Sequence, residues 1–168
     1  SDGKEYPLTH KRVKVVIPPM NDMGSIMLAA SMRYCGINAM GISKIGEEEL
    51  KLGRGMTSCK ECLPLTLVVG SLAKYIEKER KEDEITVYFM PEASGPCRFG
   101  LYNMFINNMI EKEQIRDVAT LSLTCENGYA GFSNRFTIRA WQFIIIEDVL
   151  QEIYSAVLVM AKDKEKGL

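Results

Sequence analysis

The chain has 168 residues, which is enough for one domain with a substantial core. Its 21 lysine and arginine residues nearly balance 22 aspartate and glutamate residues. A net charge of -1 gives no support for a nucleic-acid partner or for attraction to an anionic membrane. No run of about 18 uninterrupted apolar residues occurs, so we expect no transmembrane helix.

The cysteines and the first residues predict a cytoplasmic location. Five cysteines is an odd number and too few for a disulfide scaffold. The first residues are polar and lack the apolar segment of a secretory signal peptide. In a reducing compartment, a cysteine that does not simply pack in the core is usually a metal ligand or a redox group.

Short apolar runs alternate with helical patterns along the chain. The β-branched runs predict strands at residues 13–18, 38–42, 85–90 and 118–123. The helical spacing of apolar residues predicts helices at residues 25–34, 47–52, from about 64 to 84, from about 98 to 113, and 135–162.

Specific residues are expected to set the faces and ends of the first two helices. Ile26, Ala29 and Ala30 are expected on the inner face of the first helix. Gly53 and Gly55 are expected to end the second helix after a short acidic stretch.

The later helices are defined by a proline and by their apolar residues. Pro64 lacks a backbone N–H, so we expect the third helix to begin near it, which leaves Cys59 and Cys62 in the preceding turn. Trp141 and residues 143–146 surround more than half of the last helix. That helix is therefore expected either to be deeply buried or to pack on another part of a longer chain.

The alternation of strands and helices favours an α/β domain. We predict a three-layer flavodoxin-like or Rossmann-like fold with a mainly parallel sheet of about four strands. The domain is expected to span residues 12–162, between a flexible N-terminal segment (1–11) and a frayed C-terminal tail (163–168). We expect it to have been excised from a larger protein.

Four of the five cysteines are predicted at one edge of this sheet. Cys97 and Cys125 follow strands, and Cys59 and Cys62 form a CxxC motif just before a crossover helix. Ligands of such sheets bind beyond the carboxyl ends of the strands. Converging thiolates suit an iron–sulfur cluster or tetrahedral zinc, each held by three or four ligands. Cys35 is expected to be a packing residue.

Two other interpretations of these cysteines remain open from the residues alone. Free cysteines are often buried, so all of them can be packing residues. Alternatively, Cys59 and Cys62 can act as a dithiol that exchanges with disulfides. Catalysis by a Cys–His or Ser–His pair has little support, because His10 is the only histidine and precedes the first strand.

Three segments resemble a known family: GRGMTSCKECLPLTLVVGSLAKYIEKE, VYFMPEASGPCRFGLYN and ENGYAGFSNRF. They resemble the dehydratase-subunit-like domain in proteins related to 2-hydroxyacyl-CoA dehydratase activators, from about Arg12 to Leu150. The resemblance implies a flavodoxin-like fold in which cysteines hold a [4Fe-4S] cluster.

The resemblance also implies roles for single residues. Cys62 and Cys97 match the cysteines of the family's motifs, and Glu61 and Arg98 flank them. Glu61 is expected to polarise the site and Arg98 to offset cluster charge or meet an anionic ligand; a surface salt bridge is the alternative for each.

The chain departs from the family's pattern at two positions. Cys59 stands where the pattern has glycine, and Cys125 where it has a small hydroxyl residue. Each is therefore either an additional ligand or an incidental thiol, because two motif cysteines are too few for a cubane cluster.

The related activators use ATP hydrolysis to drive one low-potential electron into a cluster, which enables radical elimination of water from a 2-hydroxyacyl-CoA. The ATP-binding part is not among these 168 residues, so we expect no catalysis by this chain alone. The resemblance implies an electron-transfer or docking domain whose partners are other domains of the parent protein and an acyl-CoA dehydratase. The alternative is a structural or interaction domain of the same family that binds no cluster.

Overall fold

The computed structural model describes residues 4–21, 23–58, 60–124 and 131–161. In chain order its elements are β1 (Val13–Ile17), α1 (Gly24–Tyr34), β2 (Ala39–Gly41), α2 (Glu47–Met56), α3 (Leu63–Lys78), β3 (Ile85–Phe89), the 3-10 helix η1 (Arg98–Leu101), α4 (Tyr102–Lys112), β4 (Val118–Leu121) and α5 (Asn134–Met160).

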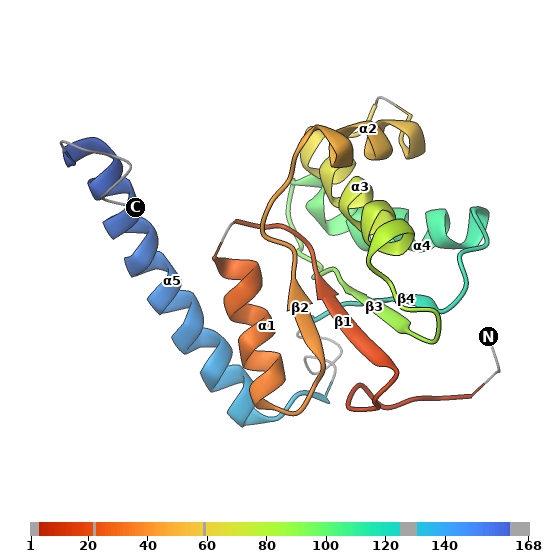
Figure 1. The fold of residues 1–168 in the computed structure, drawn as a ribbon, viewed down its shortest axis with the longest axis horizontal. Coiled ribbons are helices and arrows are strands. Elements are labelled where there is room, and N and C mark those ends of the chain that lie inside the picture. The colour runs from red at the N-terminus through yellow and green to blue at the C-terminus, as the bar shows by residue number, and fades with distance from the viewer. Residues whose placement is uncertain (1–3, 22, 59, 125–130, 162–168) are drawn as a thin grey trace.

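The four strands form one parallel sheet in the order β2-β1-β3-β4. In its register, Val15 of β1 lies between Ala39 of β2 and Val87 of β3. Helix α1 covers one face of the sheet, and α3 and α4 cover the other (Figure 1). The predicted three-layer flavodoxin-like or Rossmann-like α/β fold with a parallel sheet is confirmed.

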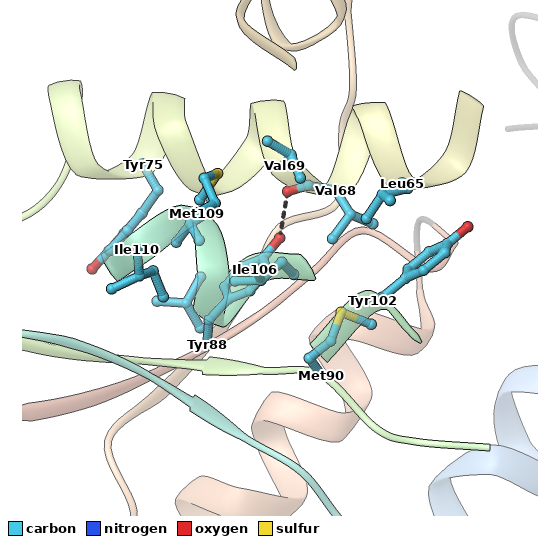
Figure 2. Packing of buried hydrophobic residues seen from close by; sticks show 12 residues of the cluster. Leu65, Val68, Val69, Tyr75, Tyr88, Met90, Tyr102, Ile106, Met109 and Ile110 are labelled. Carbon is cyan, nitrogen blue, oxygen red and sulfur yellow. Dashed lines mark hydrogen bonds between the residues drawn. The ribbon is translucent and has the colours of Figure 1, made fainter. Parts of the chain in front are cut away.

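The alternation of side chains along the strands divides the core into two layers, called here the α1 layer and the α3 layer after the helices that cover them. Odd-numbered apolar residues of β1 and β3, such as Val15 and Val87, pack with Ala29 and Met32 of α1. Even-numbered residues face the other way and pack with α3 and α4. The members of this second layer are Val16, Leu65, Val68, Val69, Leu72, Tyr75, Tyr88, Met90, Tyr102, Ile106, Met109 and Ile110 (Figure 2).

Helix α3 is held to the sheet by both packing and a hydrogen bond. Leu65, Val69 and Leu72 share its buried face; their spacing of four and three residues is the pattern that predicted this helix and its apolar face. The fully buried hydroxyl of Tyr88 donates to the carbonyl oxygen of Val68 over 2.9 Å (Figure 2). A buried tyrosine hydroxyl needs such a partner, so this bond fixes α3 over β3.

Helix α2 continues through the two glycines that were predicted to end it. An added Cβ at Gly53 would lie 1.9 Å from the carbonyl oxygen of Thr66, and one at Gly70 would lie 1.8 Å from that of Glu49. The prediction of a helix ending at residue 52 is therefore wrong, because the glycine permits a close crossing of α2 and α3 and does not act as a helix stop.

Helix α1 is also rotated relative to its predicted face. Ile26 was expected inside but is 47% exposed, whereas Ser25, Ala29 and Met32 are buried. The Ser25 hydroxyl donates to the carbonyl oxygen of Pro18 over 2.8 Å at the end of β1. This bond turns the face that carries Ser25 towards the sheet, and Ile26 consequently faces outwards.

Helix α5 begins at a capped end and continues far beyond its contact with the sheet domain. The side chain of Ser133 accepts a hydrogen bond from the N–H of Phe136, which is buried against the α1 layer. Figure 1 shows α5 running along α1 and then extending past it. Deep burial was one of two expectations for this helix and is wrong: Trp141 is 63% exposed and Ile145 60%.

Within the described ranges, no helix combines the length and apolar character that crossing a bilayer requires.

Ahead of β1, Tyr6 and Leu8 of the N-terminal segment pack against the α1 layer of the core.

Candidate functional site

The turn before α3 is closed by the Glu61 carboxylate. It accepts hydrogen bonds from the backbone N–H of Ser58 over 2.8 Å and of Lys60 over 3.2 Å, and from the Ser58 hydroxyl over 2.9 Å. The hydrogen bond from the Ser58 hydroxyl, assisted by the backbone N–H groups, lowers the pKa of Glu61. An ionised Glu61 therefore fixes the turn that leads into Cys62.

Cys62 lies at the first turn of α3, where a thiolate is favoured. It is the N-cap residue of this helix, with extended backbone angles, and Pro64 occupies the helix's first turn. Burial alone would raise the pKa of the Cys62 thiol. The Tyr102 hydroxyl, the backbone N–H groups at the helix start and the charge of Arg98 together outweigh burial, and the pKa of Cys62 is lowered.

Tyr102, the first residue of α4, connects the two halves of the site. Its hydroxyl lies 2.7 Å from the sulfur of Cys62, and its ring is buried in the α3 layer of the core. Burial raises the pKa of Tyr102, and so do the hydrogen bond to Cys62 and negative charge on Cys62 or Cys97. The Tyr102 hydroxyl therefore stays protonated at neutral pH and is able to donate to a Cys62 thiolate. Both thiols lie near enough to affect it electrostatically.

Cys97 and Arg98 approach the same turn from the other side. Cys97 is exposed and occupies the N-cap position of η1, directly before Arg98. The Arg98 guanidinium donates from Nη1 to the carbonyl oxygen of Lys60 over 3.2 Å. This hydrogen bond joins the segment that follows β3 to the turn that precedes α3.

These segments enclose an open pocket of about 340 Å³. Its polar lining comes from Lys60, Glu61, Cys62, Arg98 and Tyr102, and its apolar lining from Leu65, Leu101 and Phe105. A second cavity of about 400 Å³ shares Glu61 and Phe105 with it and extends towards Lys112. The thiol of Cys62 is thus accessible at one end of a longer groove.

The structure brings together four of the residues singled out from the sequence: Glu61, Cys62, Cys97 and Arg98. Cys59 and Cys125 lie outside the described residues. Cys35 is half-buried at the end of α1 and packs against the α1 layer, which confirms it as a packing residue. Within the described ranges, no group of three or more His, Cys, Asp or Glu residues could hold a metal ion.

The donor set can be compared with the needs of an iron–sulfur cluster. Thiolates are its usual ligands, and three or four are required. Cys62 and Cys97 supply two soft donors, and Arg98 and the α3 N-terminus supply positive potential for an anionic group. The chemistry fits, and the number of ligands depends on Cys59, Cys125 or another polypeptide.

Tyr102 is the residue of this site that sequence reasoning missed. With Phe105, Ile106, Met109 and Ile110 it forms the apolar stripe that predicted the helix from about residue 98 to 113, and membership of this stripe predicted only packing. One signal was present: it is the only hydroxyl-bearing member of that stripe, and a buried tyrosine hydroxyl requires a partner.

Comparison with protein-family models, with curated proteins and with solved structures found no match to this chain. The function is therefore argued from the geometry of these residues and from the sequence resemblance.

Proposed function

We propose that this domain binds an iron–sulfur cluster at the pocket between the start of α3 and η1. The observation that carries the proposal is the environment of Cys62, whose sulfur meets the Tyr102 hydroxyl at 2.7 Å and the positive field of Arg98. A thiolate stabilised in this way at an accessible pocket suits a metal ligand better than a packing residue.

Cys62 and Cys97 are the two proposed cluster ligands among the residues that the structure describes. Cys59 and Cys125 are the candidates for the third and fourth ligands. Arg98 offsets negative charge, and Tyr102 supplies a hydrogen bond to a ligand sulfur. Glu61 acts indirectly, by holding the turn that carries Cys62. When bound, a cluster of this kind accepts and passes on single electrons.

On the basis of the resemblance, we propose that this activity belongs to an activator-related protein; the cysteine content favours a cytoplasmic location for it. In that setting the domain receives an electron or docks an acyl-CoA dehydratase, and ATP hydrolysis belongs to other domains of the parent protein. The chain then acts as one component of an electron-transfer assembly and performs no catalysis alone.

Anaerobic reconstitution tests the proposal. The chain is incubated with iron and sulfide without oxygen, desalted, and analysed for bound iron, acid-labile sulfide and broad visible absorption. We expect uptake by the unmodified chain, loss of uptake in Cys62→Ala, and retention in Cys35→Ala, which removes a packing thiol outside the pocket. Failure of the unmodified chain and of its parent protein to bind iron, or equal uptake by both variants, would contradict the proposal.

A second candidate is an interaction domain that binds no cluster. The exposed apolar surface of α5 favours it, since Trp141 and Ile145 are both more than half exposed. A folded chain that takes up no iron in the same experiment would support this function. The dithiol interpretation of Cys59 and Cys62 is tested separately, by comparing the alkylation of both thiols under oxidising and reducing conditions.

A further inference from the structure

Helix α5 carries apolar residues around most of its circumference, on its inner and on its outer side. Its inner side, with Phe136 and Glu147 buried, contacts α1, and the Asn21 amide donates to the Glu147 carboxylate over 2.6 Å. The outer side carries apolar residues that are more than half exposed. They are Ile138 (58%), Trp141 (63%), Ile145 (60%), Val149 (52%), Ile153 (54%) and Val159 (83%).

The outer side repeats every seven residues, as in helices that pair along a seam. Ile138, Ile145, Glu152 and Val159 form one row of the repeat. Gln142, Val149 and Ala156 form the second row, each four residues after a member of the first. Alternating steps of four and three residues keep such rows on one stripe of a helix. All seven side chains are exposed along the helix.

We propose that this stripe is a self-association surface, on which α5 pairs antiparallel with α5 of a second copy of the chain. In the antiparallel register centred on residue 147, Ile145 lies against Val149 of the second copy, and the reverse contact follows by symmetry. In the same register, Ile138 lies against Ala156. The proposal is independent of the iron–sulfur function.

Glu152 is the one charged residue of the stripe, and it determines the direction of pairing. In the antiparallel register, Glu152 lies opposite Gln142 of the second copy, and an amide is a suitable hydrogen-bond donor to a carboxylate. A parallel pair would place Glu152 against Glu152. Two carboxylates at one buried position repel each other, so the parallel arrangement is disfavoured.

The available area suits a stable dimer. With the flanking Trp141 and Ile153 included, the exposed apolar residues of the outer side present at most roughly 800 Å² per chain, which is of the size that each partner of a specific interface buries. The sheet domain lies on the α1 side of α5, away from the stripe (Figure 1). Two copies paired through the outer side therefore hold their sheet domains on opposite sides of the helix pair, without collision.

Measurement of molar mass in solution tests the proposal. By light scattering coupled to gel filtration, the chain is expected at twice its 18.9 kDa mass. Ile145→Glu should give a monomer with an unchanged circular dichroism spectrum. The matched control is Met104→Glu, which places the same charge on a methionine of α4 that is 60% exposed, and which should remain a dimer. A monomeric unmodified chain would overturn the proposal, as would dimers of all three proteins.

A crosslinking pair tests the direction. Ile146→Cys lies close to its symmetry mate in the antiparallel register, so mild oxidation should give a covalent dimer. In this register residue 156 lies opposite residue 138 of the second copy. The two Ala156→Cys thiols are therefore 18 residues apart along the helix axis, which is about 27 Å at 1.5 Å per residue. The unmodified chain, oxidised in parallel, reports crosslinking by native thiols. Efficient crosslinking through residue 156 and not through residue 146 would overturn the antiparallel arrangement.

Discussion

The hydroxyl of Tyr102 lies 2.7 Å from the sulfur of Cys62, which is 40 residues earlier in the chain. The tyrosine belongs to the apolar layer beneath α3, whereas the thiol lines an accessible pocket. The packing of α4 against α3 therefore determines the polarity of the candidate site.

Replacing Tyr102 by phenylalanine should make Cys62 a weaker nucleophile near neutral pH. The Tyr102 hydroxyl is one of the groups that lower the pKa of Cys62, so its loss raises that pKa and reduces the thiolate fraction. We expect the alkylation rate of Cys62 in the metal-free chain to fall several-fold, as a lost hydrogen bond of about 1 kcal/mol implies. Mass spectrometry of the alkylated peptides measures this rate over a range of pH.

The control for this measurement is Tyr34→Phe, which removes an exposed hydroxyl at the end of α1 that is bonded to Arg135 and leaves the pocket intact. An unchanged or faster alkylation of Cys62 in Tyr102→Phe would show that the Tyr102 hydroxyl does not stabilise the thiolate.

Gly70→Ala should destabilise the fold by about 2–3 kcal/mol, because the added Cβ would overlap the carbonyl oxygen of Glu49 at the crossing of α2 and α3. Gly55→Ala is the matched control, since an added Cβ there meets nothing within 4 Å in the same helix pair. Alanine favours a helix over glycine, so Gly55→Ala should leave stability unchanged or raise it by up to about 1 kcal/mol. Urea unfolding measures both changes, and equal destabilisation by the two variants would contradict the close crossing.

Glu49→Gln should lower stability at neutral pH by about 1 kcal/mol and have little effect in acid. Glu49 is buried, which raises its pKa, but the ion pair with Lys74 at 2.6 Å and the N–H of Gly46 at 2.8 Å lower that pKa overall. A carboxylate with a lowered folded-state pKa stabilises the fold above about pH 5, and this contribution is lost as the pH falls below about 4.

The difference in unfolding free energy between Glu49→Gln and the unmodified chain should therefore disappear on acidification. Glu47→Gln, in the same first turn but exposed, serves as the control. A difference that stays constant from neutral to acid pH would show that charge pairing with Lys74 is not the cause.

Tyr88→Phe should destabilise the fold by about 1 kcal/mol, because it removes the buried hydrogen bond to the Val68 carbonyl and little packing volume. Unfolding in urea measures the loss. A Tyr88→Phe variant as stable as the unmodified chain would mean that water replaces the hydroxyl as the carbonyl's partner.

Local patterns in the sequence were sufficient for most of the fold. The run VKVVI predicted β1 and ITVYF predicted β3, since β-branched and aromatic residues favour a strand buried on both faces. The spacing of Leu65, Val69 and Leu72 predicted both α3 and the face that it buries. Alternation of these elements then predicted a parallel sheet with helices on both sides, because a crossover connection needs a helix.

Long-range contacts decided the details that the sequence left open. The preference of Gly53 for ending a helix is worth only about 1 kcal/mol, which the packing of α2 on α3 outweighs. The orientation of Ile26 depends on the bond from Ser25 to the end of β1. The hydrogen-bond partner of Cys62 is Tyr102, whose position in an apolar stripe predicted only that it would be buried. Spacing within a few residues specifies an element and its apolar face, but which atoms meet depends on how elements distant in the chain cross in space.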